Sequence, residues 1–395
     1  MAKEAATELS TFFARMEVPV VVKETPEKGK HVVAMKAIPA GTELFEERPL
    51  VCWPFLTVED SGLEGEDAGS GESSRAPTIS TESMLCSRCL RDTTSLSSRV
   101  NCPACRTAHF CDEDCYSAGE ALHSILCGLE ISLREFHIAQ ERASEDGSLP
   151  ISVEAVARCV ASIATRYLAA AEANPAVAVS DLFATASHNI NRFVEPPLNS
   201  EFDEIDAPAW YKFVREVLAP RLSDMFAQRK QPVDVVSALL SDDTLKTILG
   251  QLTVNAQAVN IASAATTGTE ESGPSADVSA DGERDGEGGI TAKISQGAGM
   301  YTLQSCFNHS CEPNVKIRYS NSNEITLYTS RDVAAGEELN ISYIAELFLM
   351  YEDVVQRRKR LAPYFFTCKC SKCEREVREA EAAVAAEKLG GVVSS

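Results

Sequence analysis

The sequence lacks any run of about 18 apolar residues, the length that a membrane-spanning helix requires. Its first ten residues contain Lys3, Glu4 and Glu8 before any apolar stretch, so they do not predict a secretory signal. We therefore expect an intracellular protein, in the nucleus, the cytoplasm or both. With 395 residues and 44% hydrophobic composition, the chain can bury a substantial core and form two or three domains.

Basic residues are also scarce, because 37 Lys and Arg face 58 Asp and Glu, which gives a formal net charge of -21. An acidic surface repels phosphate backbones, so we expect no direct binding of nucleic acid, and it attracts basic proteins or peptides. Much of this charge lies in two low-complexity segments rich in Gly, Ser, Asp and Glu, 56–83 and 262–292. Neither can bury much apolar area, so both are predicted to be flexible acidic linkers.

Clustered cysteines are the strongest pattern in the chain, and in a reducing compartment they indicate metal ligands rather than disulfides. Cysteine or histidine pairs a few positions apart present two tetrahedral ligands each to zinc. The first cluster has eight such ligands: Cys86, Cys89, Cys102, Cys105, Cys111, Cys115, His123 and Cys127. Eight ligands make two closed sites, and spacing alone allows sequential or interleaved pairing.

A second cluster near the C-terminus supplies only three ligands, so a closed tetrahedral site needs a fourth, for which Cys311 is the best candidate. The three ligands are Cys368, Cys370 and Cys373. With four protein ligands at each site, we expect three structural Zn²⁺ ions and no open coordination position for catalysis. Three other cysteines, Cys52, Cys159 and Cys306, are expected to be ordinary buried thiols.

Between residues 128 and 261 apolar residues recur at spacings of three and four, which predicts a packed helical block. Short strand-like runs flank this block on both sides, at 18–22, 31–34, 314–319 and 324–328. The segment 38–44 (IPAGTEL) also resembles 333–339 (VAAGEEL), each a glycine turn that leads into a short strand. We interpret the two ends of the chain as one discontinuous β domain.

These motifs follow the order of the SET and MYND domain (SMYD) family of protein lysine methyltransferases, which the sequence resembles. The cysteine pairs of the first cluster match the MYND zinc finger, and the other matching segments are 297–301 (GAGMY), 308–311 (NHSC), 336–343 (GEELNISY) and 364–370 (YFFTCKC). The resemblance implies an α+β fold in which a discontinuous β-rich SET domain contains a MYND zinc module and a helical insert. A zinc-binding post-SET segment follows.

On this reading the chain divides into eight segments. Two segments form the SET domain (15–55 and 293–345), and two are the acidic linkers. The others are the MYND finger (84–127), the helical insert (128–261), the post-SET segment (346–376) and a tail (377–395). In the MYND fold the ligand pairs interleave, with the first and third pairs on one ion and the second and fourth on the other. The chain is most like the subgroup of the fifth family member, because Cys306 stands where leucine is usual and only 22 residues follow Cys373.

The resemblance implies a protein lysine N-methyltransferase that uses S-adenosylmethionine (SAM) and acts on histone or non-histone proteins. Methyl transfer to lysine is an in-line displacement, so the protein must align a neutral amine with the methyl group of SAM and exclude water. Tyr343 matches the catalytic tyrosine, and His309 is expected to contact SAM largely through its backbone. The residues that match cofactor-binding positions are Lys28, Gly29, Lys30, Asn308, His309, Tyr343 and Phe366. His31 departs from the family pattern, which has glycine there, and this affects the expected geometry of the cofactor loop.

Two other functions remain open. A non-catalytic adaptor would bind proline-containing peptides through its MYND module while the SET part, altered at His31, has lost turnover. The presence of Tyr343, Asn308 and His309 argues against it, because an inactive site has no chemical need for them. A zinc-dependent DNA-binding factor is disfavoured by the acidic charge and by the lack of a basic recognition helix.

Overall fold

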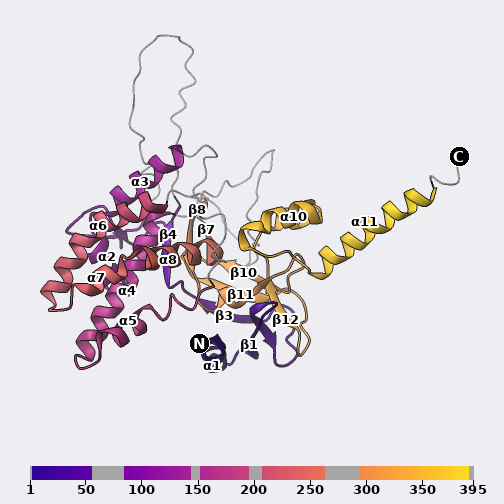
Figure 1. Cartoon of the computed structure of the whole chain (residues 1–395), viewed down its shortest axis with the longest axis horizontal. Helices are drawn as coiled ribbons and strands as arrows, with labels where there is room; N and C mark the ends of the chain where they lie inside the picture. The colour runs from indigo at the N-terminus through magenta and orange to yellow at the C-terminus, as the bar shows by residue number, and fades with distance from the viewer. Residues whose placement is uncertain (1, 56–83, 144–151, 195–206, 263–293, 391–395) are drawn as a thin grey trace, which may run out of the picture.

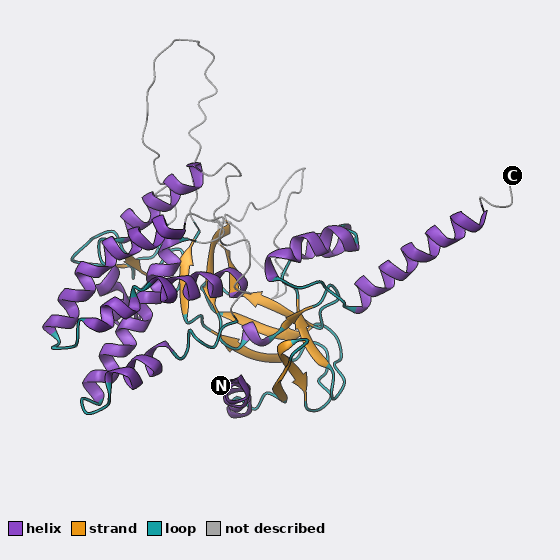
Figure 2. Cartoon of the chain, in the orientation of Figure 1, coloured by secondary structure: helices purple, strands orange, loops and turns teal. Residues whose placement is uncertain are grey.

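The structure is a computed structural model that describes residues 2–55, 84–143, 152–194, 207–262 and 294–390 (Figure 1). The predicted acidic linkers lie outside these ranges, apart from Ala262. Within the described ranges, no helix has both the length and the apolar composition to cross a membrane. Strands gather in one region of the molecule and most helices in another (Figure 2).

The first sheet joins the two ends of the chain. Its strand order is β1-β2-β12-β9, formed by Val20–Thr25, Gly29–Ala34, Glu338–Ile341 and Asn308–His309. Strand β12 pairs antiparallel with β2 and parallel with β9, so the centre of the sheet combines segments about 300 residues apart. This arrangement brings the end of β12 next to β9, where the candidate site lies.

Two further sheets complete the β region. The order β10-β11-β3 is formed by Val315–Tyr319, Ile325–Thr329 and Glu43–Glu47, and the order β4-β8-β7 by Val51–Pro54, Ile294–Met300 and Ala256–Ala262. The two similar segments found in the sequence meet through an antiparallel bridge between Ile38 and Val333. Their glycines, Gly41 and Gly336, both have positive φ, at 74° and 83°. The predicted discontinuous β domain and the α+β class are therefore confirmed.

Strand β8 contains two glycines because its neighbours lie too close for a side chain. A Cβ on Gly297 would lie 2.7 Å from Leu90 Cδ1 and 2.7 Å from the carbonyl oxygen of Trp53. A Cβ on Gly299 would lie 2.7 Å from Pro49 Cβ. Leu90 belongs to the first zinc cluster region, so the zinc finger packs directly against this strand.

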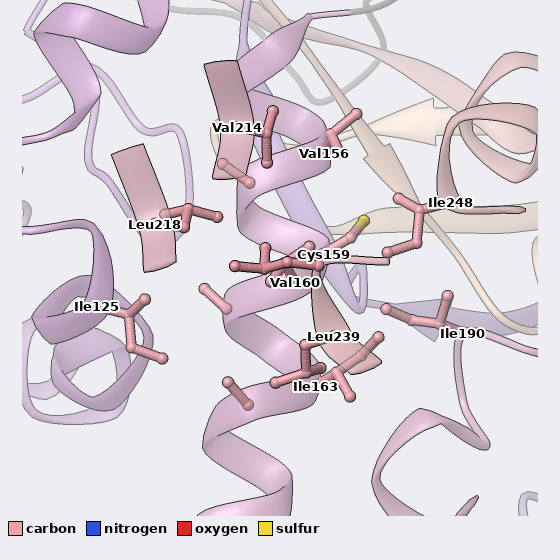
Figure 3. Close-up of a cluster of buried hydrophobic side chains, with 14 of the residues drawn as sticks. Ile125, Val156, Cys159, Val160, Ile163, Ile190, Val214, Leu218, Leu239 and Ile248 are labelled. Carbon is pink, nitrogen blue, oxygen red and sulfur yellow. The ribbon is translucent and has the colours of Figure 1, made fainter. Parts of the chain in front are cut away.

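The helical block surrounds one buried helix, α4. After the zinc finger's α2 (Glu113–Leu126), the described part of the block contains α3 (Glu130–Ala143), α4 (Val153–Ala173), α5 (Val179–Ser187), α6 (Ala207–Gln228), α7 (Asp234–Leu239) and α8 (Asp242–Asn255). Helix α4 is apolar on nearly all sides, as expected for a helix in the interior. Figure 3 shows its Val156, Val160 and Ile163 among side chains of the surrounding helices, including Leu218 and Leu239. The helices of the block end at Asn255, and the residues after it form β7.

Both ends of the described chain are helical, which the sequence reading had not predicted. At the N-terminus, α1 (Ala2–Arg15) buries Leu9 and Phe13 in the β core. Near the C-terminus, short helices α9 (Glu346–Tyr351) and α10 (Val354–Leu361) precede α11 (Ser371–Gly390). Helix α11 extends away from the rest of the molecule and includes most of the predicted tail (Figure 1).

Candidate active site and metal centres

The twelve predicted zinc ligands lie in three groups, and within each group all ligand atoms are within 4.8 Å of one another. The groups are Cys86, Cys89, Cys111 and Cys115; Cys102, Cys105, His123 and Cys127; and Cys311, Cys368, Cys370 and Cys373. The finger pairs are thus interleaved, and Cys311 joins the C-terminal cluster.

The spacing of the sulfur atoms matches a tetrahedral zinc site. With Zn–S bonds of about 2.3 Å, two sulfurs on one tetrahedron lie about 3.8 Å apart. The separations are 3.7 Å between Cys89 and Cys111, 3.8 Å between Cys102 and Cys127, and 3.9 Å between Cys311 and Cys368. The three groups therefore fit three zinc ions.

Neighbouring groups orient the ligands of the finger. Asp112 caps α2 by accepting from the Cys115 backbone N–H at 2.7 Å, which fixes Cys115 in the first turn. His123 Nδ1 lies 2.9 Å from a Glu130 carboxylate oxygen, so Nε2 is left for the metal, an arrangement common around zinc-bound histidines. His109 lies outside the three groups and bonds to Asn101 instead.

The turn that holds the first zinc ligands is also fixed to the rest of the protein. Three consecutive carbonyl groups, those of Ser87, Arg88 and Cys89, accept hydrogen bonds from side chains or backbone outside the finger. Arg158 of α4 donates to the first at 3.0 Å, and Asn323 donates to the other two at 3.0 and 2.7 Å. The finger is therefore an integral part of the structure rather than a loosely attached module.

The third metal group contains a buried cation. Arg357 of α10 has no exposed surface, and its Nη2 lies 3.4 Å from Cys373 Sγ and 2.9 Å from Glu376 Oε2. Four thiolates around one Zn²⁺ carry a net charge of -2, so a guanidinium beside them reduces the cost of burying the site. Arg357 was not predicted from the sequence, because its position 16 residues before Cys373 shows no local pattern.

Tyr343 lies just after β12, and its hydroxyl donates a hydrogen bond to the Phe307 carbonyl at 2.9 Å. Its ring centroid is 4.9 Å from that of Tyr364 and 6.2 Å from that of Phe366, to which it is nearly perpendicular. Burial raises the pKa of Tyr343, so the hydroxyl stays protonated at neutral pH. The structure thus brings Tyr343 together with Phe366 and adds Tyr364, which the sequence reading had not selected.

His309 connects Tyr343 to the third metal group through its side chain. Nδ1 accepts from the Tyr343 backbone N–H at 3.0 Å, and Nε2 lies 3.3 Å from Cys311 Sγ. Because Nδ1 is the acceptor, the proton is assigned to Nε2, which donates to the sulfur. Burial lowers the pKa of His309 to about 4, so the ring is neutral.

This use of the His309 side chain was not predicted, although one feature of the sequence could have indicated it. His309 ends strand β9, and Cys311 follows it only two residues later, so the two side chains could be expected to lie close together. The imidazole of His309 was therefore well placed to reach the sulfur of Cys311.

The loop that contains Lys28 and Gly29 contacts Asn308 of β9 and Glu338 of β12. The Asn308 amide nitrogen donates to the Lys28 carbonyl at 3.1 Å and to Glu338 Oε1 at 3.2 Å. Lys28 Nζ in turn lies 2.5 Å from Glu338 Oε2. Gly29 has a φ of 61°, a left-handed conformation that favours glycine.

The other two residues of this loop turn toward different neighbours. The Lys30 ammonium donates to the carbonyl of Arg192 in the helical block, so its charge is not directed toward Asn308. His31 is buried in β2, and its Nδ1 lies 3.1 Å from the Gly29 carbonyl. The substitution that departs from the family pattern is thus accommodated within the strand, with Gly29 kept at the turn.

Comparison with protein families identifies this arrangement. Residues 29–344, which include strands β2 to β12, the zinc finger and the helical block, match the SET domain family. The chain belongs to the SET domain family. The match begins at Gly29 and ends one residue after Tyr343, so it contains Asn308, Glu338 and Tyr343. Lys28, Tyr364 and Phe366 lie outside it.

Curated relatives match shorter parts of the chain. Protein-lysine N-trimethyltransferase SMYD5 of Gallus gallus is 41% identical over 80 residues, 20% of this chain and 19% of the relative. Histone-lysine N-methyltransferase ATXR2 of Arabidopsis thaliana is 42% identical over 81 residues, covering 20% and 16%. Histone-lysine N-methyltransferase SMYD3 of Mus musculus is 36% identical over 94 residues, covering 24% and 21%. The chain thus spans about a fifth of the length of these relatives.

Proposed function

We propose that this SET domain protein is a SAM-dependent protein lysine N-methyltransferase. The observation that carries the proposal is the position of Tyr343, whose hydroxyl is fixed on the Phe307 carbonyl, one residue before Asn308. The rings of Tyr364 and Phe366 stand beside it. A partly buried tyrosine hydroxyl beside two aromatic rings suits the alignment of an alkyl amine in an apolar environment.

The residues of the site fit SAM by their chemistry. Phe366 is 37% exposed with its centroid 6.1 Å from His309, so it can stack on a flat purine ring. Asn308 and the loop of Lys28 and Gly29 offer polar groups for the amino-acid end. When bound, SAM supplies a methyl group on a positively charged sulfur.

The remaining requirements of the reaction fall on the protein. The Tyr343 hydroxyl uses its proton on Phe307, which leaves its lone pairs to accept an N–H from the substrate amine and hold it in line. The aromatic rings beside it exclude water, and an ammonium without water next to the positively charged sulfur of SAM would be disfavoured, so the site favours the neutral amine that can attack. We assign the three zinc ions a structural role, because each group already supplies four ligands.

Basic proteins are the proposed substrates, histone or non-histone, because the net charge of -21 attracts cationic partners. A second ligand, a proline-containing peptide, is proposed for the MYND finger. A groove of about 610 Å³ between the finger and α6 offers room for it, with Leu129, Val217 and Pro220 among its lining residues.

The function is tested by incubating the protein with isotopically labelled SAM and a panel of basic proteins, followed by mass spectrometry of modified lysines. Replacing Tyr343 with Phe should retain SAM binding and lower methyl transfer by about a hundredfold, the effect of losing a positioned polar group. Tyr351→Phe is the matched control, since that residue is 75% exposed. SAM binding without labelling of any protein would favour the adaptor, and equal activity of the Tyr343 variant would exclude Tyr343 as the catalytic residue.

A further inference from the structure

Glu338 joins two segments of the site that are distant in the sequence. Its side chain is 17% exposed, and its two carboxylate oxygens have different partners, the Lys28 ammonium at 2.5 Å and the Asn308 amide nitrogen at 3.2 Å. The residue begins β12, where its backbone lies opposite Val33 and its carbonyl accepts from Asn314 at 2.8 Å. The carboxylate therefore extends from a fixed position in the sheet.

The contacts of Asn308 determine which way its amide points. An amide nitrogen has two hydrogens, and both are used here, on the Lys28 carbonyl and on Glu338. The reversed amide would place its oxygen against a carbonyl and a carboxylate, so it is strongly disfavoured. Within the described residues no donor reaches the Asn308 oxygen, which is therefore directed to accept from a ligand.

Lys28 presents the complementary charge on the same side of the carboxylate. Its ammonium has three donors, and the side chain is 56% exposed, so the contact with Glu338 leaves donors accessible. The Asn308 oxygen can accept from the ammonium group of an α-amino acid, and the Lys28 ammonium can bind its carboxylate. The two side chains therefore suit the two charges of such a ligand. Glu338 is the group that fixes both.

We propose that Glu338 is a positioning residue that orients Asn308 and Lys28 toward the amino-acid end of SAM. This inference rests on the proposed function, and it assigns a recognition role to a residue that contacts no part of the reaction itself. Without the carboxylate, the Asn308 amide nitrogen keeps only the Lys28 carbonyl of the two partners that set its orientation. The Lys28 side chain then loses its anchor and gains rotational freedom.

The test uses two ligands that differ only at this end. S-adenosylhomocysteine carries the amino-acid group, whereas 5′-methylthioadenosine keeps the adenosine and sulfur but lacks it. In calorimetric titration, Glu338→Gln should bind S-adenosylhomocysteine about tenfold more weakly than the parent protein, the effect of one misaligned charge-assisted contact. Its affinity for 5′-methylthioadenosine should be unchanged.

Glu43→Gln serves as the matched control, because it removes the same charge from an exposed ion pair with Arg318. It should alter neither affinity. Equal weakening of both ligands by Glu338→Gln, or no weakening of either, would overturn the role of Glu338. Failure of the parent protein to bind S-adenosylhomocysteine would instead refute the proposed function itself, so the two failures are distinguishable.

Discussion

Replacing Glu154 with Gln should destabilise the protein strongly, because its buried carboxylate forms ion pairs with two arginines, Arg134 and Arg158. Glu154 is 1% exposed and lies in the first turn of α4. One oxygen accepts from Arg134 Nε at 2.7 Å, and the other from Arg158 Nε at 2.9 Å. Arg158 also donates to Ser87, so the same cluster connects the helical block to the zinc finger.

The size of the effect follows from the pKa of Glu154. The two arginines hold it at about 2 despite burial, compared with an ordinary 4.5. This difference corresponds to about 3 kcal/mol of folding free energy at neutral pH, similar to the cost of breaking other buried ion pairs. Since the pKa is lowered in the folded state, the contribution is complete above pH 4.5 and is lost as the pH falls toward 2. Thiolate ligands bind protons and release zinc in acid, so the comparison belongs at pH 7.5.

Urea unfolding of both proteins in the presence of zinc measures the difference. Glu172→Gln is the matched control, because it makes the same substitution at the other end of α4 in an exposed ion pair with Arg229. That variant should lose less than about 1 kcal/mol. If Glu154→Gln is as stable as Glu172→Gln, the buried cluster does not stabilise the fold and the reasoning from its pKa is wrong.

Three further predictions concern the third metal group. Elemental analysis should find three zinc ions per chain in the parent protein and two in Cys370→Ser, and a count of one or none in folded parent protein would refute the ligand sets. Cys370→Ser should also weaken SAM binding in calorimetry, because Cys311 and His309 connect the zinc of the third metal group to Tyr343. Unchanged affinity for SAM would show that this zinc site does not support the cofactor site. Arg357→Gln should release one zinc to a chelator faster than the parent, whereas the exposed Arg360→Gln should not. Equal rates for the two variants would show that the guanidinium does not stabilise the thiolates.

The sequence was most informative where short spacing or a local turn determines the structure. Pairs of metal ligands a few residues apart must come together, so the twelve ligands could be predicted from their spacing, whereas the interleaved grouping of the finger pairs was implied by the family resemblance. The similar segments around Gly41 and Gly336 also indicated related turns, and the structure pairs them through Ile38 and Val333. Even Cys311, distant in sequence, could be predicted by counting the ligands that a closed tetrahedral site needs.

Other elements depend on contacts that no local pattern records. Strand β8 contains two glycines, which are poor strand formers, and it is a strand because β4 and β7 pair with it on both sides. The roles of Glu338 and Arg357 likewise arise from partners up to 310 residues away. By contrast, α11 was missed although its many Ala, Glu and Lys residues favour a helix, so propensity alone would have indicated it.

The joining of β2 to β12 has a consequence for the biosynthesis of the protein. Strand β2 ends at Ala34, and its partner begins at Glu338, so at about 5–20 residues per second the ribosome needs roughly 15–60 s to supply it. During that interval strands β1 and β2 cannot complete their sheet, and the unpaired edge of β2 is open to pairing with other chains. Yield in cells should therefore depend on chaperones that bind early during translation. A chain truncated before β12 should aggregate, even though it keeps the whole zinc finger.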